Sequence, residues 1–257
     1  MLKTVMLAVL TVTCMLRHRG VRVLMYHAIK DGSSKYSVTP QLFEKQMAFI
    51  ARRCNPVPLA NVVEYARGER ELSDGSVAVT IDDGYADTYE IAFPVLRRYG
   101  VPATVFLTSK LQRMPALGNL ERLTEAQVRE VSESGLVSFE AHGRTHQNLA
   151  TLAQDPARFR EETSGCADDV ERMTGKRPRF YAYAAGHREG AAELLEEQGF
   201  EAAFGITEGL VYPGDSRFAL RRVQIDGSMS HVLALLRIVG PVDLYHRFIS
   251  RLRRFVS

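Results

Sequence analysis

The 257-residue sequence has little cysteine, little net charge and no apolar run long enough to cross a membrane easily. Its three cysteines, Cys14, Cys54 and Cys166, are an odd number at unrelated positions and include no Cys-x-x-Cys pair. This argues against a disulfide framework and a thiolate zinc site. The formal net charge of +3 is too close to neutral to indicate nucleic-acid binding. No repeat or long linker interrupts the chain, so we expect one domain with a large core.

Residues 1–20 form an apolar N-terminal segment. Thr4 to Leu16 follow Lys3 and resemble the apolar region of a secretory signal, but no Ala-x-Ala cleavage site follows. Basic residues come directly after the run, and such residues tend to stay on the cytoplasmic side of a membrane. A signal and an uncleaved anchor therefore both stay open, as do membrane-associated, periplasmic and cytoplasmic locations. The predicted domain occupies residues 21–257.

Apolar strands alternate with amphipathic helices along this domain. Thr39 and Pro40 suit the start of a helix, Thr124 and Gln127 can form a capping box, and Pro94 should kink or break its helix. Repeated strand–helix units are typical of a parallel sheet covered by helices, and about seven units favour a closed or nearly closed barrel. We expect strands over 21–27, 76–81, 101–109, 136–143, 179–186 and 201–206, and helices over 37–53, 85–100, 123–135, 156–175, 188–199, 230–240 and 243–255.

Acids and imidazoles follow several predicted strands. The stretch VTIDDGYAD places Asp82 and Asp83 after a buried strand, His27 ends the first strand, and His142 and His146 follow the fourth. Each pattern alone has an ordinary explanation: a turn, a partly buried histidine, or a pair on a helix surface. Because function sits at the carboxyl ends of parallel strands, we expect these side chains to converge. Two histidines and one aspartate can hold a divalent metal, and the second aspartate can act beside it as a general base.

VTIDDGYADTY and AHGRTHQNL together resemble the polysaccharide deacetylase family, the NodB-homology group of carbohydrate esterases, whose pattern reads T-F-D-D-G and then H-[ST]-x-x-H. The resemblance spans roughly Val21 to Arg222. It implies an α/β fold, a distorted (β/α)7 barrel of the NodB-homology type. It also implies metal-dependent removal of N-acetyl groups from a carbohydrate, such as an N-acetylglucosamine-containing polysaccharide or a glycan precursor. The implied cofactor is one divalent ion, zinc by preference, with cobalt, nickel or manganese as alternatives.

The resemblance also implies roles for individual residues. Asp82 matches the catalytic base. The opening VRVLMYHAI resembles the branch that deacetylates exopolysaccharide poly-N-acetylglucosamine, where the general acid is a histidine near the N-terminus. That role falls to His27, and an imidazole with an ordinary pKa near 6.5 is suited to it. In other branches the acid lies late in the chain, where His231 is the alternative. The implied metal ligands are Asp83, His142 and His146.

Apart from Ile81 in place of the phenylalanine of the pattern, which is an apolar exchange, the sequence departs from the family pattern at three places. Gly143 replaces a serine or threonine, which removes a loop-stabilising hydroxyl. Ala182 stands where many members carry an arginine that holds the base. Ala184 and Ala185 replace a proline and an aromatic residue, so the aromatic wall of the groove is thinner. A catalytically impaired carbohydrate-binding homologue is therefore the alternative function. The implied substrate-binding residues are Tyr85, Tyr183 and Ala185, the last through its backbone N–H.

The C-terminal stretch DLYHRFISRLRRFVS predicts a helix with one apolar stripe and several arginines beside or opposite it. An ordinary helix packed on the barrel and a basic amphipathic helix on an anionic membrane both fit this pattern. The expected partners are an N-acetylated oligo- or polysaccharide and, in the second interpretation, a membrane surface. No nucleic acid is expected, and the sequence does not indicate an oligomeric state.

Overall fold

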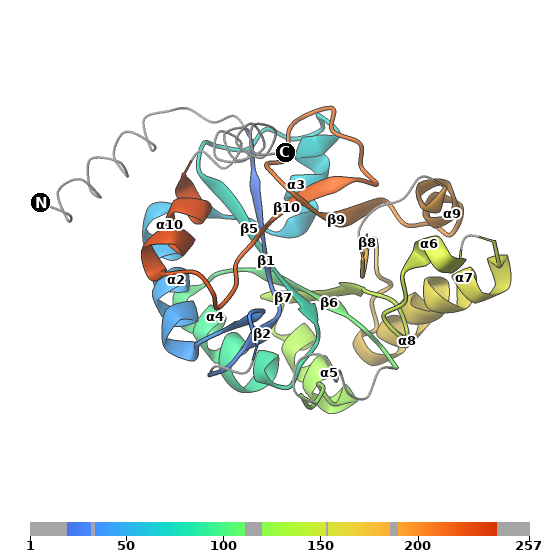
Figure 1. Ribbon diagram of the computed structural model, residues 1–257, viewed down its shortest axis with the longest axis horizontal. Helices are drawn as coiled ribbons and strands as arrows, with labels where there is room; N and C mark the ends of the chain where they lie inside the picture. Colours follow the sequence, from blue (N-terminus) through green and yellow to red (C-terminus); the bar gives the residue numbers. More distant parts are fainter. Residues whose placement is uncertain (1–19, 32–33, 111–119, 153, 186–189, 241–257) are drawn as a thin grey trace, which may run out of the picture.

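The computed structural model describes residues 20–31, 34–110, 120–152, 154–185 and 190–240 (Figure 1). In this part of the chain, strands close into a parallel barrel in the order β1-β10-β9-β8-β7-β6-β5, and β5 pairs again with β1. The predicted (β/α)7 barrel is confirmed. The strands of this ring are β1 (Arg22–Tyr26), β5 (Ser76–Asp83), β6 (Ala103–Leu107), β7 (Val137–Ala141), β8 (Phe180–Ala182), β9 (Ala202–Glu208) and β10 (Leu220–Gln224).

Helices surround the barrel (Figure 1), and two of them begin at the capping residues that the sequence indicates. Before α2 (Pro40–Arg53), the Thr39 side chain accepts a hydrogen bond from the Leu42 N–H, which satisfies a donor that the helix leaves free. Before α5 (Glu125–Glu133), Thr124 and Gln127 form the reciprocal capping box. These capping interactions join residues within four positions of each other, so they can be predicted without knowledge of the tertiary packing.

The helix expected over 85–100 is broken near its proline, as predicted. A short π-helical turn, η1 (Thr88–Ala92), continues into α4 (Phe93–Tyr99), in which Pro94 lies in the first turn. Gly100 ends α4 with a left-handed φ of 63°, a conformation that glycine adopts without steric cost.

Several elements differ from the sequence-based expectations, which lack the short elements β2 (Ala28–Ile29), β4 (Asn55–Pro56) and α6 (Leu149–Leu152) and place a helix over 37–53 where the structure first has strand β3 (Ser37–Val38). The helix expected over 156–175 is two helices, α7 (Pro156–Glu162) and α8 (Ser164–Thr174), which meet at Thr163. Helix α3 (Leu59–Ala66) and strand β10 have no counterpart in those expectations. Helix α3 begins after Pro58 without a side-chain cap, so the usual start signal is missing. The remaining elements are α9 (Ala191–Glu197) and α10 (His231–Val239).

Side chains alternate across the barrel wall. On β5, Ala78 belongs to the cluster inside the barrel, whereas Val79 packs in the cluster beneath the helices. The interior is filled by aromatic rings, with Phe106 and Phe204 at a centroid distance of 5.7 Å. Truncating such a fully buried phenylalanine to alanine costs about 3–5 kcal/mol. The barrel is therefore a packed core that holds its strand ends in fixed positions.

Parts of the sequence-based predictions lie outside the described residues. They are the apolar segment up to residue 19, the last predicted helix over 243–255, and residues 186–189, where one predicted strand ends and the next predicted helix begins. Within the described ranges, no helix combines the length and apolar character that a membrane crossing requires.

Candidate active site

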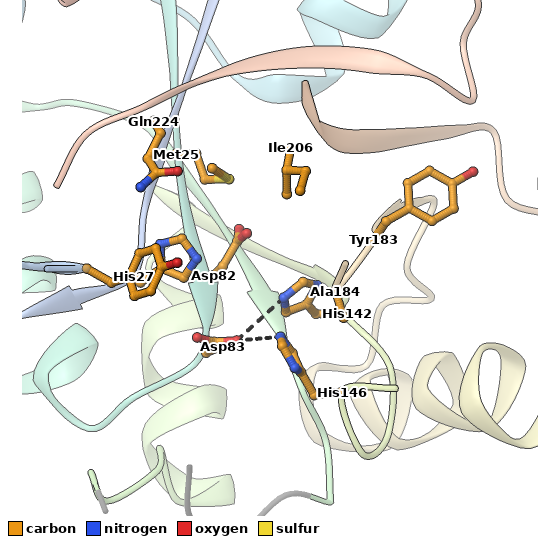
Figure 2. A pocket seen from close by; sticks show the side chains of 11 residues that line it. Met25, His27, Asp82, Asp83, His142, His146, Tyr183, Ala184, Ile206 and Gln224 are labelled. Atoms are coloured by element: carbon orange, nitrogen blue, oxygen red, sulfur yellow. Dashed lines mark ion pairs between the residues drawn. The ribbon is translucent and has the colours of Figure 1, made fainter. Parts of the chain in front are cut away.

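A cavity of about 330 Å³ opens at the carboxyl ends of the strands (Figure 2). Its volume lies at the lower end of the range typical of ligand-binding pockets. The structure brings all the predicted catalytic and metal-binding residues to this one cavity. They are His27, Asp82, Asp83, His142 and His146.

Three of these side chains form a candidate metal site. The Oδ1 atom of Asp83 lies 3.5 Å from Nε2 of His142 and 3.3 Å from Nε2 of His146. The three ligand atoms all lie within 4.8 Å of one another (Figure 2). One carboxylate and two imidazoles are suitable ligands for zinc and other divalent transition metals, and three protein ligands leave a coordination position for water.

Hydrogen bonding supports the fit of a cation here. Nδ1 of His142 lies 2.8 Å from the carbonyl oxygen of Ala182, which can only accept, so Nδ1 carries a proton. In a neutral His142 ring, Nε2 then directs a lone pair toward Asp83. Without a cation, burial acts to lower the pKa of His142, but the hydrogen bond to Asp83 and the charges of Asp82 and Asp83 together raise it, so a proton on Nε2 is favoured more than in a free histidine. A bound cation would replace that proton and relieve the repulsion between lone pairs.

The backbone explains how adjacent aspartates take different directions. Strand alternation sends Asp82 into the barrel with Ala78 and Thr80, and would send Asp83 out toward the helices. Asp83 instead has a left-handed φ of 75°, followed by Gly84 at 77°. A Cβ at Gly84 would lie 2.3 Å from the Leu107 side chain. Aspartate tolerates the left-handed region better than most residues, so the sequence Asp-Asp-Gly permits this turn.

Asp82 is held by an arginine that the sequence reasoning missed. Nη1 of Arg222, on β10, donates a 2.7 Å hydrogen bond to Oδ1 of Asp82, and both side chains are at most 2% exposed. Nε of Arg222 donates to the Gly205 carbonyl at 2.9 Å, which fixes the guanidinium. Arg222 therefore makes, from another strand, the contact that the resemblance assigns to the arginine missing at Ala182. Its only sequence signal is a basic residue in the short alternating stretch ALRRVQI.

The two carboxylates both have pKa values below the ordinary range. Burial acts to raise the pKa of Asp82, but the charge and hydrogen bond of Arg222, together with the nearby His142 and His27, outweigh it. Burial also acts to raise the pKa of Asp83, and hydrogen bonds from His142 and His146 hold it well below its usual value. Both acids are therefore ionised at neutral pH.

His27 lines the cavity and is half-buried, whereas His231 lies at the exposed start of α10 and does not line the cavity. Burial lowers the pKa of His27 below 6.5, against the opposing charges of Asp82 and Asp83. The expectation of an ordinary imidazole pKa is thus corrected, because the ring loses hydration at the strand end. A smaller fraction of His27 carries a proton at neutral pH than in a free histidine.

The loop that carries both candidate histidine ligands is built around Glu162, at the end of α7. The buried carboxylate accepts hydrogen bonds from the backbone N–H groups of Thr145, at 3.0 Å, and Gln147, at 3.0 Å. Gly143 has a φ of 86°, and a Cβ there would lie 2.4 Å from Glu162 Oε1. The departure from serine or threonine at this position is therefore compensated, because the carboxylate occupies the space of the missing side chain. Sequence reasoning missed Glu162, which appeared to be an ordinary helix residue.

The predicted substrate-binding residues lie in different environments. Tyr85 is fully buried and does not line the cavity; the Arg122 guanidinium lies 5.2 Å from its ring centroid. Tyr183 lines the cavity, but its hydroxyl donates to the Phe218 carbonyl at 3.0 Å. Ala185 is exposed, next to residues that the structure does not describe. Of these three residues, only Tyr183 has a side chain that can contact a ligand in the cavity.

A parallel barrel that presents an open set of three metal ligands beside a fixed carboxylate defines a candidate metal-dependent hydrolase. The family model for polysaccharide deacetylases matches residues 69–203, more than half of the sequence. The chain therefore belongs to the polysaccharide deacetylase family.

Comparison with individual proteins agrees with this assignment. The chain is 28% identical over 213 residues to YxkH of Bacillus subtilis, a protein named for the same family, and the match covers 81% of this chain and 72% of YxkH. It is 26% identical over 208 residues to the poly-beta-1,6-N-acetyl-D-glucosamine N-deacetylase of Staphylococcus epidermidis, covering 77% and 71%. The structure of IcaB from Ammonifex degensii shares the fold, with a TM-score of 0.77, 23% identity and coverage of 88% and 99%.

Proposed function

We propose that the protein is a metal-dependent de-N-acetylase that acts on an N-acetylglucosamine-containing polysaccharide or glycan precursor. One observation carries the proposal. The ligand set of Asp83, His142 and His146 shares a small cavity with the Asp82 carboxylate and the His27 imidazole. Family membership and the relative that acts on poly-N-acetylglucosamine support the substrate class.

The ligands Asp83, His142 and His146 would hold one divalent cation. Zinc fits their nitrogen and oxygen donors, and cobalt, nickel and manganese are alternatives. When bound, the cation supplies a Lewis acid that lowers the pKa of water and polarises an acyl carbonyl. The protein fixes the ligands through Ala182 behind His142 and through Glu162 beneath the loop.

Asp82 is proposed as the general base. Arg222 holds its Oδ1, so Oδ2 is left to take a proton from the attacking water. The lowered pKa makes Asp82 a weak base, but it guarantees that the carboxylate is ionised. A weak base suffices where the water is itself made acidic.

His27 is proposed as the general acid. Water adds to the acetyl carbonyl carbon, the C–N bond breaks, and acetate leaves while the amine nitrogen takes a proton from His27. The proton that Asp82 removes from water balances the one that His27 supplies. Because burial lowers the pKa of His27, kcat/KM should fall with rising pH at a midpoint below 6.5.

Acetate release tests the proposal. The protein is stripped with a chelator, reloaded separately with zinc, cobalt, nickel or manganese, and incubated with β-1,6- and β-1,4-linked N-acetylglucosamine oligomers. Enzymatic acetate determination and the mass of the product should show loss of acetyl groups only in reloaded protein. Binding of oligomers by metal-loaded protein without any acetate release would instead identify a catalytically impaired binding homologue.

A further inference from the structure

Two polar or aromatic side chains in the cavity have no role in the chemistry above. Gln224 ends β10 and lines the cavity, as does Tyr36, which lies just before β3. Figure 2 shows Gln224 on the side of the cavity away from Tyr183 and Ala184, where the expected aromatic wall is thin. This placement raises the question of what Gln224 and Tyr36 recognise.

The orientation of the Gln224 amide is determined by its neighbour. Nε2 of Gln224 lies 2.9 Å from Oδ2 of Asp226. The other oxygen of Asp226 accepts hydrogen bonds from Ser228, through its N–H at 3.0 Å and its hydroxyl at 2.5 Å. A carboxylate can only accept, so the NH₂ group of Gln224 must face Asp226. Among the described residues none donates to Oε1, which is left as an acceptor for a ligand.

The backbone of Gln224 is also fixed. Its N–H donates to Oε1 of Glu208 at 3.2 Å, and its carbonyl accepts from Nε of Arg237 at 2.9 Å. Arg237 in turn forms an ion pair with Glu208. A side chain held at both ends loses little conformational entropy when it binds a ligand. Gln224 therefore presents its acceptor in a preorganised position.

Tyr36 is supported by the same turn. The Gly227 N–H donates to the Lys35 carbonyl at 2.9 Å, and a Cβ at Gly227 would lie 1.9 Å from the Ser37 carbonyl oxygen. The turn Asp226–Gly227 therefore packs directly against the segment that carries Tyr36. The Tyr36 ring lies 5.3 Å from the His27 ring, centroid to centroid, and is half-buried. One turn thus positions an aromatic face and a hydrogen-bond acceptor beside the proposed general acid.

We propose that Tyr36 and Gln224 form the sugar-binding subsite beside His27. The Tyr36 ring packs on the apolar face of a pyranose, and Oε1 of Gln224 accepts a hydrogen bond from a sugar hydroxyl. This inference rests on the proposed function and deepens it. It makes the substrate a pyranoside that is recognised through a free hydroxyl, and it places recognition on the wall away from Ala184.

Binding measurements separate this inference from the proposed chemistry. Isothermal titration calorimetry with a metal-loaded Asp82→Asn protein measures Kd for an N-acetylglucosamine oligomer without turnover. Adding Gln224→Leu should weaken binding about 3- to 10-fold, the usual net value of one hydrogen bond. Adding Tyr36→Ala should weaken it by a similar factor, whereas Tyr36→Phe, which keeps the ring, should bind like the parent.

A set of monodeoxy oligomers identifies the hydroxyl. At one deoxy position, the parent protein should bind the deoxy oligomer more weakly by the same factor by which Gln224→Leu weakens binding of the full oligomer. The Gln224→Leu variant should bind that deoxy oligomer and the full oligomer equally well. The subsite would be overturned if the Gln224→Leu substitution and the deoxy substitution weakened binding additively at every position. It would also be overturned if Gln224→Leu and Tyr36→Ala left Kd unchanged while metal content was retained. In the active protein, the same substitutions should raise KM and leave kcat nearly unchanged. If these effects on Kd are observed but no acetate is released, the result would count against the proposed function and not against the subsite.

Discussion

The Arg222 side and the histidine side of the cavity balance negative charge in different ways. Asp82 has a permanent partner, because Arg222 is part of the barrel wall and is fully buried. Asp83 instead forms its ion pairs with two imidazoles, whose charge depends on protonation. In the proposed mechanism, the base side (Asp82 and Arg222) is therefore complete in the folded chain, whereas the ligand side (Asp83, His142 and His146) needs a cation from solution. The predictions below test whether the two sides differ in this way.

The largest expected effect is at the ligand side. Asp83→Asn keeps a residue that tolerates the left-handed φ of 75° but removes the ligand charge. Metal should be lost, and kcat/KM should fall on the order of 10³-fold or more, because a metal supplies several kcal/mol of catalysis. Metal analysis of the purified variant and acetate release measure both effects. A variant that binds metal at full stoichiometry would show that Asp83 is not a ligand.

Asp82→Asn should impair turnover without affecting metal binding. The amide keeps the shape of the carboxylate but removes its basicity, so kcat should fall about 10²–10⁴-fold while metal content stays normal. Turnover and metal content are measured on the same preparation. Loss of metal would mean that the two aspartates have exchanged roles, and the comparison would be wrong.

His27→Ala should have a comparable or smaller effect than Asp82→Asn. Loss of the acid should slow acetate release about 10²–10⁴-fold without changing metal content. It should also remove the decline of kcat/KM with rising pH that titration of His27 causes. The control is His231→Ala on the exposed start of α10, which should behave like the wild type. The opposite result would return the acid role to His231.

Arg222→Met should destabilise the protein by about 3–5 kcal/mol, because it leaves the Asp82 charge buried without its partner. In the wild type, Arg222 lowers the pKa of Asp82, so this stability is present above the unfolded value near 3.9 and is lost as pH falls through the folded value. Without Arg222, burial dominates and the pKa rises, so the acidic limb of kcat/KM should move to higher pH. Urea unfolding and a pH–rate profile measure the two effects.

The neighbouring Arg221 offers a matched control for that substitution. Its side chain is 34% exposed and pairs with Asp215, so Arg221→Met should cost less than about 1 kcal/mol. If Arg221→Met and Arg222→Met lowered the free energy of unfolding equally, the buried Asp82–Arg222 pair would contribute no more to stability than the exposed pair. Combining Asp82→Asn with Arg222→Met should recover part of the stability, since neither substitution then leaves an opposite charge alone.

The smallest effect is expected from the support beneath the histidines. Glu162→Gln replaces one acceptor oxygen of the carboxylate that holds Thr145 and Gln147. The loop that carries His142 and His146 should therefore be held less firmly. Metal affinity should weaken about 10- to 100-fold, as is typical of supporting contacts. Glu161→Gln, at a side chain that is 68% exposed, should have no effect. Equal metal affinity in the two variants would remove Glu162 from the site.

The sequence predicted those features whose signals are local. The capping residues Thr39 and Thr124 act within one helical turn, and Asp82 with Asp83 stand in one short motif. Arg222 was missed because its partner lies 140 residues away and an isolated arginine suggests an exposed side chain. Glu162 was missed for a similar reason, because its charge serves the backbone of a distant loop. Long-range charge compensation leaves no pattern in neighbouring residues.

Barrel closure has a consequence for the order of folding. The first strand pairs with the last, with Leu24 beside Val223 and Met25 beside Gln224, so the ring closes only when nearly all of the described chain is available. Such distant pairings carry a large loop-closure cost and are slow to form. A nascent chain that has emerged only through β9 holds Asp82 without its arginine. We therefore expect catalytic competence to arise late in folding, after Asp83 on β5 and the histidines that follow β7 are already brought together through β6.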